Sequence, residues 1–157
     1  MLQLNLPLYP VKIIQSNGKQ LIFDSIRKKH VVLTPEEWVR QQFIQFLIHE
    51  KGYSSSLLSN EVSIELNGTK RRCDTVLYSN TLKPLLIVEY KSPNVEISQQ
   101  VFDQIVRYNC VLKVPYIIVT NGLRHFCCHM NYETLCTSFL IDIPDYKSLK
   151  EDYFDLK

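Results

Sequence analysis

The stretch LLIVEYKSP, residues 85–93, limits the folds open to this chain more than any other part of the sequence. The apolar run that ends in Ile87 and Val88 predicts a buried β-strand, and Pro93 prevents the strand from continuing. Glu89 lies near the end of this strand, and Lys91 follows two residues later on the same face. A carboxylate and an ammonium at the end of a buried strand need an explanation.

The length and composition predict a single domain. The chain has 157 residues, 45% of them hydrophobic, and its four glycines and seven prolines leave no room for a long flexible linker. We expect an extended leader over residues 1–33, a core over about 34–144 and an acidic tail over 145–157. Five cysteines, mostly in apolar segments, indicate reduced thiols, and no run approaches the roughly 20 apolar residues of a membrane span. We therefore expect a cytoplasmic protein that does not bind membranes.

The order of the elements predicts an α/β fold with a mixed sheet flanked by two helices. Asn17-Gly18 predicts a hairpin turn within the leader. A helix begins after Thr34, with Pro35 in its first position and Glu37 placed for a capping box, and it ends before Gly52. Three strands follow, over residues 57–66, 71–78 and 84–90, and then a helix over about 98–112. A buried strand over 114–122 and two edge strands over 125–130 and 138–143 complete the predicted order.

Antiparallel pairing of the second and third of these strands brings charged groups together. Asp74 should lie opposite residues 88–90, about 5 Å from a side chain on the same face, next to Glu89 and Lys91. Two carboxylates about 4 Å apart repel by roughly 4 kcal/mol at an effective dielectric constant of 20. A divalent cation with oxygen ligands offsets this repulsion and can activate a water molecule. The alternative is an ordinary cross-strand ion pair at the surface.

Five blocks of the sequence resemble the PD-(D/E)XK nuclease superfamily, in particular the N-terminal nuclease domain of type I restriction enzyme R subunits. The blocks VLTPEEWVRQ, RRCDTVLY, LLIVEYKSP, FDQIVRYN and IIVTNG follow that family's order and spacing over roughly residues 23–122. The resemblance implies a restriction-endonuclease-like core and a Mg²⁺-dependent DNA endonuclease, in which Mn²⁺ can replace Mg²⁺. Asp74 and Glu89 would hold the metal, with the carbonyl of Tyr90 as a further candidate ligand. Lys91 would activate water, and cleavage would leave a 5′-phosphate.

The same resemblance suggests supporting residues. Gln104 and Tyr108 match a Q-x-x-x-Y pattern that many of these nucleases carry, although a polar pair on the helix surface is an equal explanation from the pattern alone. Glu36, followed by Arg40, matches the family's first-helix glutamate and is a candidate auxiliary acid. Stabilisation of the helix N-terminus is the alternative for Glu36, whereas the capping box accounts for Glu37.

Other charged and metal-binding residue types carry weaker signals. The net charge of +2 is too small to indicate a nucleic-acid binder, but the cluster of Lys70, Arg71 and Arg72 leads into Asp74 and is a candidate for binding DNA phosphates. The cluster RKK at residues 27–29 is the weaker candidate. The His and Cys residues at 125–129 lack zinc-ligand spacing, so an ordinary strand is the better interpretation.

One departure from the family concerns ATP. R subunits continue into an ATP-driven translocase, whereas this sequence contains no G-x-x-x-x-G-K-[ST] phosphate loop. We therefore expect a stand-alone nuclease domain that uses no ATP and acts on DNA as a homodimer or with a separate translocase or recognition subunit. The alternative function is a catalytically weak or inactive module for nucleic-acid binding or assembly in a restriction or defence system.

Overall fold

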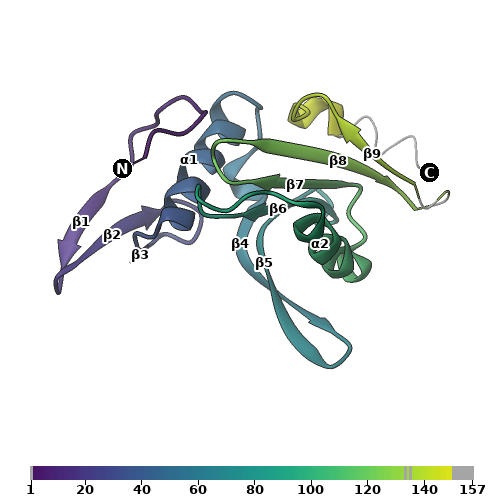
Figure 1. Ribbon diagram of the computed structural model, residues 1–157, viewed down its shortest axis with the longest axis horizontal. Coiled ribbons are helices and arrows are strands. Elements are labelled where there is room, and N and C mark those ends of the chain that lie inside the picture. The colour runs from purple at the N-terminus through teal and green to yellow at the C-terminus, as the bar shows by residue number, and fades with distance from the viewer. Residues whose placement is uncertain (1, 133, 135, 150–157) are drawn as a thin grey trace.

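A six-stranded mixed sheet forms the centre of the molecule in the computed structural model, which describes residues 2–132, 134 and 136–149 (Figure 1). The strand order is β4-β5-β6-β7-β8-β9, with β6 and β7 parallel and every other pair antiparallel. The strands are β4 (Leu58–Leu66), β5 (Thr69–Tyr78), β6 (Pro84–Tyr90), β7 (Tyr116–Thr120), β8 (His125–Asn131) and β9 (Cys136–Leu140). The predicted α/β fold with a mixed sheet is confirmed.

The two helices begin where the sequence predicts. In α1 (Pro35–His49), the hydroxyl of Thr34 accepts a hydrogen bond from the backbone N–H of Glu37 at 3.0 Å. The capping-box explanation of the Glu37 side chain is wrong, because its carboxylate accepts from Gln41 at 2.8 Å and pairs with Arg40 at 3.3 Å. The second helix, α2 (Gln99–Leu112), follows Ser98, and a short 3-10 turn, η1 (Ser55–Leu57), precedes β4.

The helices cover opposite faces of the sheet and define two cores. On the α1 side, Val39, Phe43 and Leu47 lie in one buried cluster with Val88 and Ile118. The second cluster forms on the α2 side and contains Phe102, Ile105, Val76, Ile87 and Ile117. Neighbouring residues of β6 and β7 thus enter different cores, which explains the unbroken apolar run in β6.

The last two strands differ in part from the prediction. β8 lies between β7 and β9, so of these last two strands only β9 lies at an edge of the sheet. The interpretation of residues 125–129 as an ordinary strand is confirmed, because they lie in β8, where Cys127 faces the α1 core and Cys128 faces the α2 core. Both thiols are buried and free of disulfides, as is Cys73. Residues 146–149 form a helical turn, and the rest of the expected tail, residues 150–157, lies outside the described part of the chain.

A second, three-stranded antiparallel sheet precedes α1 and extends from the body of the molecule at the left of Figure 1. It consists of β1 (Ile13–Ser16), β2 (Lys19–Asp24) and β3 (Lys29–Val32). Asn17 and Gly18 have φ angles of 48° and 73°, as a type I′ hairpin turn requires. The hairpin was predicted within the leader, whereas β3 was not.

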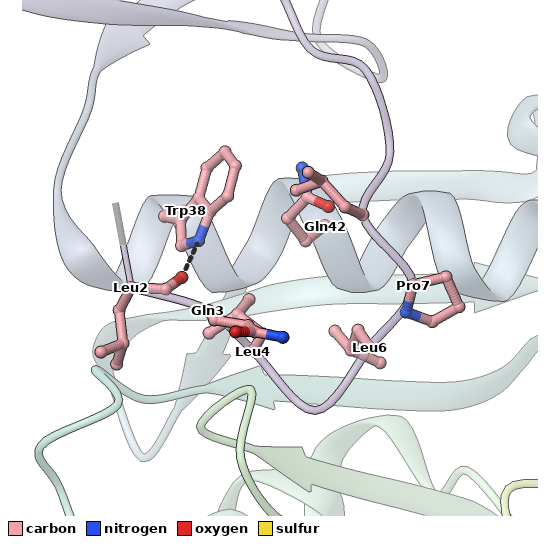
Figure 2. Close-up of a pocket in the computed structure, with 8 residues that line it drawn as sticks. Leu2, Gln3, Leu4, Leu6, Pro7, Trp38 and Gln42 are labelled. Atoms are coloured by element: carbon pink, nitrogen blue, oxygen red, sulfur yellow. Dashed lines mark hydrogen bonds between the residues drawn. The ribbon is translucent and has the colours of Figure 1, made fainter.

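Residues 2–9 run across α1 before this sheet begins. The Trp38 indole N–H donates to the carbonyl of Leu2 at 3.1 Å, and Gln42 exchanges two hydrogen bonds with the backbone of Tyr9. Figure 2 shows the pocket of about 440 Å³ that this segment encloses against α1. The segment also packs on the Asn121-Gly122 turn, where Gly122 has a φ of +82° and an added Cβ would lie 2.7 Å from Leu4 Cδ2.

Within the described ranges, no helix is long and apolar enough to cross a membrane.

Candidate active site

The register of β5 and β6 brings the three predicted catalytic residues to one place. Thr75 pairs with Val88, so the next position sets Asp74 opposite Glu89, as the sequence predicted. Asp74 Oδ2 accepts the backbone N–H of Tyr90 at 2.9 Å, and Lys91 Nζ donates to Glu89 Oε1 at 2.7 Å. The backbone N–H of Lys91 donates to the Thr120 carbonyl at 2.9 Å, which fixes the chain just beyond β6 against β7.

The electrostatics of this site favour the binding of a cation. Burial raises the pKa of Glu89 to about 7, with a further contribution from Asp74 and opposition from Lys91. Burial also raises the pKa of Asp74, although Arg40 and the N–H of Tyr90 act in the opposite direction. Both carboxylates are therefore harder to ionise than in water, and a cation beside them would relieve that cost.

Glu36 lies close enough to take part in the same electrostatic field. It is half-buried in the first turn of α1, and its pKa is raised by burial and by the charge of Asp74, while Lys91 and Arg40 lower it. The predicted auxiliary acid thus belongs to the charged surroundings of Asp74.

Arg40 holds the side of Asp74 that faces α1. Its guanidinium, in a residue only 3% exposed, donates to Asp74 Oδ1 at 3.0 Å and to Glu61 Oε1 at 2.6 Å, and it lies over the ring of Tyr90. Burial opposes its charge, but Asp74, Glu37 and Glu61 outweigh this effect and raise the pKa of Arg40. The pair fixes the orientation of the Asp74 carboxylate.

Glu61 is the residue that sequence reasoning missed. It accepts from Arg40 and, at 2.7 Å, from Arg72, and these bonds lower its pKa against the effect of burial. Its φ of +59° is rare for a residue other than glycine, and strained backbone of this kind is often found at functional sites. One signal was available in the sequence, because counting back from the Asn67-Gly68 turn sets residue 61 opposite Asp74.

A chain of buried and partly buried hydrogen bonds connects the N-terminal sheet to the site. The Asp24 carboxylate accepts from Asn60 at 3.0 and 3.2 Å, and Asn60 accepts from the hydroxyl of Thr75 at 2.7 Å. Thr75 in turn accepts from the hydroxyl of Tyr90 at 3.1 Å, and the backbone N–H of Tyr90 binds Asp74. The sheet of β1, β2 and β3 is thus held in a fixed relation to the candidate site.

The remaining predicted residues lie on the β4–β5 hairpin and on α2. Lys70, Arg71 and Arg72 are exposed on the hairpin, which extends beyond the sheet at the bottom of Figure 1. Gln104 and Tyr108 lie on α2, but their side chains are outside the described part of the structure, so their predicted roles are untested.

The donor set determines which metal ion the site could accept. Among the described residues, no three His, Cys, Asp or Glu side chains are arranged to hold a metal. Mg²⁺ commonly binds through one or two carboxylates and completes its shell with water and substrate phosphates. Asp74 and Glu89, with the backbone carbonyl of Tyr90 as a further candidate ligand, fit such an open site better than a closed one.

Comparison with known families gives a direct result. The family model described as the N terminus of the type I restriction enzyme R protein matches residues 35–144, more than half of the chain. The chain belongs to this family. The match begins at the first residue of α1 and includes all six strands of the main sheet, so the site of Asp74, Glu89 and Lys91 lies within it.

A solved structure supports the fold of the R-protein N terminus in this chain. It is the structure of a fragment assigned to the HsdR subunit of a type I restriction enzyme from Vibrio vulnificus YJ016. The two share 20% sequence identity with a TM-score of 0.58, and the match covers 78% of this chain but only 26% of the other. No curated protein sequence matches this chain significantly.

Proposed function

We propose that this R-protein N-terminal domain is a Mg²⁺-dependent endonuclease that hydrolyses phosphodiester bonds in DNA. The observation that carries the proposal is the placement of Asp74 opposite Glu89, with Lys91 paired to Glu89 at 2.7 Å. Membership of a restriction-enzyme family supports DNA as the substrate.

Each residue has a separate role in the proposed reaction. Asp74 and Glu89 hold Mg²⁺, for which Mn²⁺ can substitute, and the Tyr90 carbonyl is a further ligand. The bound ion would acidify a water molecule and neutralise charge on a phosphoryl oxygen. Lys91 orients the attacking water, because its ammonium already lies beside Glu89. Arg40 keeps the Asp74 carboxylate in place.

The surrounding residues contribute to substrate binding. Lys70, Arg71 and Arg72 contact DNA phosphates from the exposed hairpin, which is the usual way in which basic side chains position a protein on DNA. Glu36, Gln104 and Tyr108 support the site. Cutting both strands requires two sites, so we infer a homodimer or a complex with a separate translocase or recognition subunit, acting in the cytoplasm.

Plasmid cleavage tests this function. Supercoiled plasmid is incubated with Mg²⁺ or Mn²⁺ and with the wild type, Lys91→Ala or the exposed control Lys147→Ala. We expect metal-dependent nicking by the wild type and the control, and its loss in Lys91→Ala. Cleavage that persists in Lys91→Ala at the wild-type rate contradicts the assigned site.

One observation favours the second candidate, a binding or assembly module without turnover. Arg40 already neutralises part of the Asp74 charge, with its Nη2 3.0 Å from Oδ1, and this reduces the need for a metal. The two functions differ in metal binding. The nuclease requires a metal ion at Asp74, whereas a module without a metal site predicts no change of the melting temperature when Mn²⁺ is added.

A further inference from the structure

The outer face of the N-terminal sheet carries exposed lysine and apolar side chains and no carboxylate. The side chains of Ile22 and Asp24 point inward and are fully buried, so the alternate residues of β2 point outward. Cross-strand pairing puts Phe23 beside His30 and Lys19 beside Ser16 on this outer face. The face therefore carries Lys12, Ile14, Ser16, Lys19, Leu21, Phe23, His30 and Val32, of which Ile14 is 44% and Val32 48% exposed. Lys29 pairs with Asp24 and lies on the other side of the sheet.

The positive charge of the chain is concentrated in this segment. Residues 10–33 contain five Lys or Arg side chains and one carboxylate, a net charge of +4, whereas the whole chain has a formal charge of +2. The carboxylate of Asp24 is already paired with Arg27 at 2.5 Å. In the part of the chain that the structure describes, no ion pair within 4.0 Å involves the lysines at positions 12, 19, 28 and 29. These ammonium groups are available to an external anion.

The sheet is also rigidly connected to the candidate active site. Asp24 of β2 is linked through Asn60 and Thr75 to Tyr90, whose backbone binds Asp74. On the α1 side, Arg27 lies 3.6 Å from Glu37. A polyanion bound to the outer face would therefore keep a constant position relative to Asp74.

We propose that the outer face of the β1–β2–β3 sheet binds the phosphate backbone of double-stranded DNA beside the cleavage site. This inference rests on the proposed nuclease function and gives it a second DNA-contacting surface, separate from the β4–β5 hairpin. In Figure 1 the sheet and the hairpin are two distinct projections from the body of the molecule. DNA that contacts both would be held at two places, and such contacts fix its position without reading its sequence.

The charge of this segment favours a polyanion such as DNA as the occupant of the face. No acidic side chain points outward from it, and lysines lie near both ends of the β1–β2 hairpin, at positions 12 and 19. Phe23 and His30 lie edge to face beside Lys12, at 5.2 Å between ring centroids. A second copy of this chain would bring the same positive charge to the face and be repelled.

The experiment measures binding of a short fluorescein-labelled DNA duplex by anisotropy, without divalent metal, over a series of salt concentrations. The test variant is Lys12→Gln/Lys19→Gln. The matched control is Lys113→Gln/Lys147→Gln, which removes two exposed lysines outside this sheet. Thermal unfolding of both variants establishes that they fold. We expect the test variant to bind at least about tenfold more weakly, and the slope of log K against log salt to fall by about 2, since each phosphate contact contributes about 0.9.

Two results would overturn the inference. The first is equal duplex affinity and equal salt slope in the test variant and the control. The second is a dimer of the wild type in analytical ultracentrifugation that the substitution Ile14→Glu converts to monomers, while the affinity for the duplex stays unchanged. The face would then bind a second copy of the chain. The metal-free assay is independent of cleavage. If duplex binding depends on Lys12 and Lys19 but the protein does not nick plasmid, the nuclease function alone is refuted. If the protein nicks plasmid but duplex binding does not depend on these lysines, the DNA-binding surface alone is refuted.

Discussion

The substitution Asp24→Asn tests whether the N-terminal sheet is fixed to the site by a buried carboxylate. Asp24 is fully buried, and its Oδ1 accepts the backbone N–H groups of Ile26 and Arg27. Its Oδ2 accepts from Arg27 Nε at 2.5 Å and from Asn60 Nδ2 at 3.0 Å. Asparagine can keep the hydrogen bonds at Oδ1, which include a longer one from Asn60 at 3.2 Å, but its amide N–H₂ then faces the two donors that bound Oδ2. Each buried donor left without a partner costs about 1 to 3 kcal/mol, so we expect a loss of about 3 kcal/mol.

Thermal unfolding at neutral pH measures this loss. For a chain of this size 1 kcal/mol corresponds to about 2 to 4 °C, so the melting temperature should fall by about 6 to 12 °C. Asp145→Asn is the matched control, because that side chain is 65% exposed and lies 3.8 Å from Lys51, and it should cost less than about 0.5 kcal/mol. The reasoning is refuted if Asp24→Asn destabilises the protein no more than the control does.

The pH dependence of the same pair of proteins has a definite sign. Burial raises the pKa of Asp24. Hydrogen bonds from Arg27 and Asn60 lower the pKa by more than burial raises it, so the net shift is downward. A carboxyl group with a lowered pKa stabilises the fold above its unfolded pKa of about 3.9, and this contribution disappears as the pH falls through the folded pKa. The difference between wild type and Asp24→Asn should therefore shrink in acid.

Three further predictions concern the site and the N-terminal segment. Mn²⁺ should raise the melting temperature of the wild type but not of Asp74→Ala, because a ligand stabilises the protein only by binding its native state. Scanning fluorimetry measures the melting temperatures, and an equal rise in the variant contradicts the metal site. Glu61→Gln should cost about 2 kcal/mol in urea unfolding, because the buried Arg40 loses the charge of its partly buried partner, while the exposed Arg72 contributes little. Glu65→Gln, at an exposed position, should cost little. Gly122→Ala should destabilise by about 1 to 3 kcal/mol more than Gly18→Ala in the same assay. Both have positive φ, but only at Gly122 would a Cβ meet a side chain within 3 Å, so equal losses would show that this contact does not matter.

The parts of the fold that follow from local sequence could be predicted. Asn17-Gly18 and Asn67-Gly68 specify tight turns, and a hairpin turn sets the register of the strands on either side. The short connection between β5 and β6 predicts that Asp74 lies opposite residues 88–90. It does not give the exact partner, because a register shift between Leu77 and Tyr78 moves the pairing by one residue and sets Asp74 opposite Glu89. β3 was not predicted, because a four-residue strand that begins with Lys29 and His30 has little apolar pattern of its own.

The charged network around the site depends on tertiary structure and could not be read from local patterns. Glu37 has ideal spacing for a capping box, but Arg40 and Gln41 bind its carboxylate. Glu61 lies in a segment that reads as an ordinary strand, and its left-handed backbone has no signal in the residue type. The predictions for Gln104 and Tyr108 remain predictions, since their side chains lie outside the described residues.

The parallel pairing of β6 with β7 has a consequence for the order in which the site assembles. β5 and β6 are joined by a short connection, so Asp74 and Glu89 can meet in a local hairpin soon after β6 is synthesised. The backbone N–H of Lys91 donates to the carbonyl of Thr120, which enters the sheet after the chain has crossed over through α2. During folding we therefore expect the two carboxylates to come together early and the lysine to be fixed last, when its non-local contact with β7 closes.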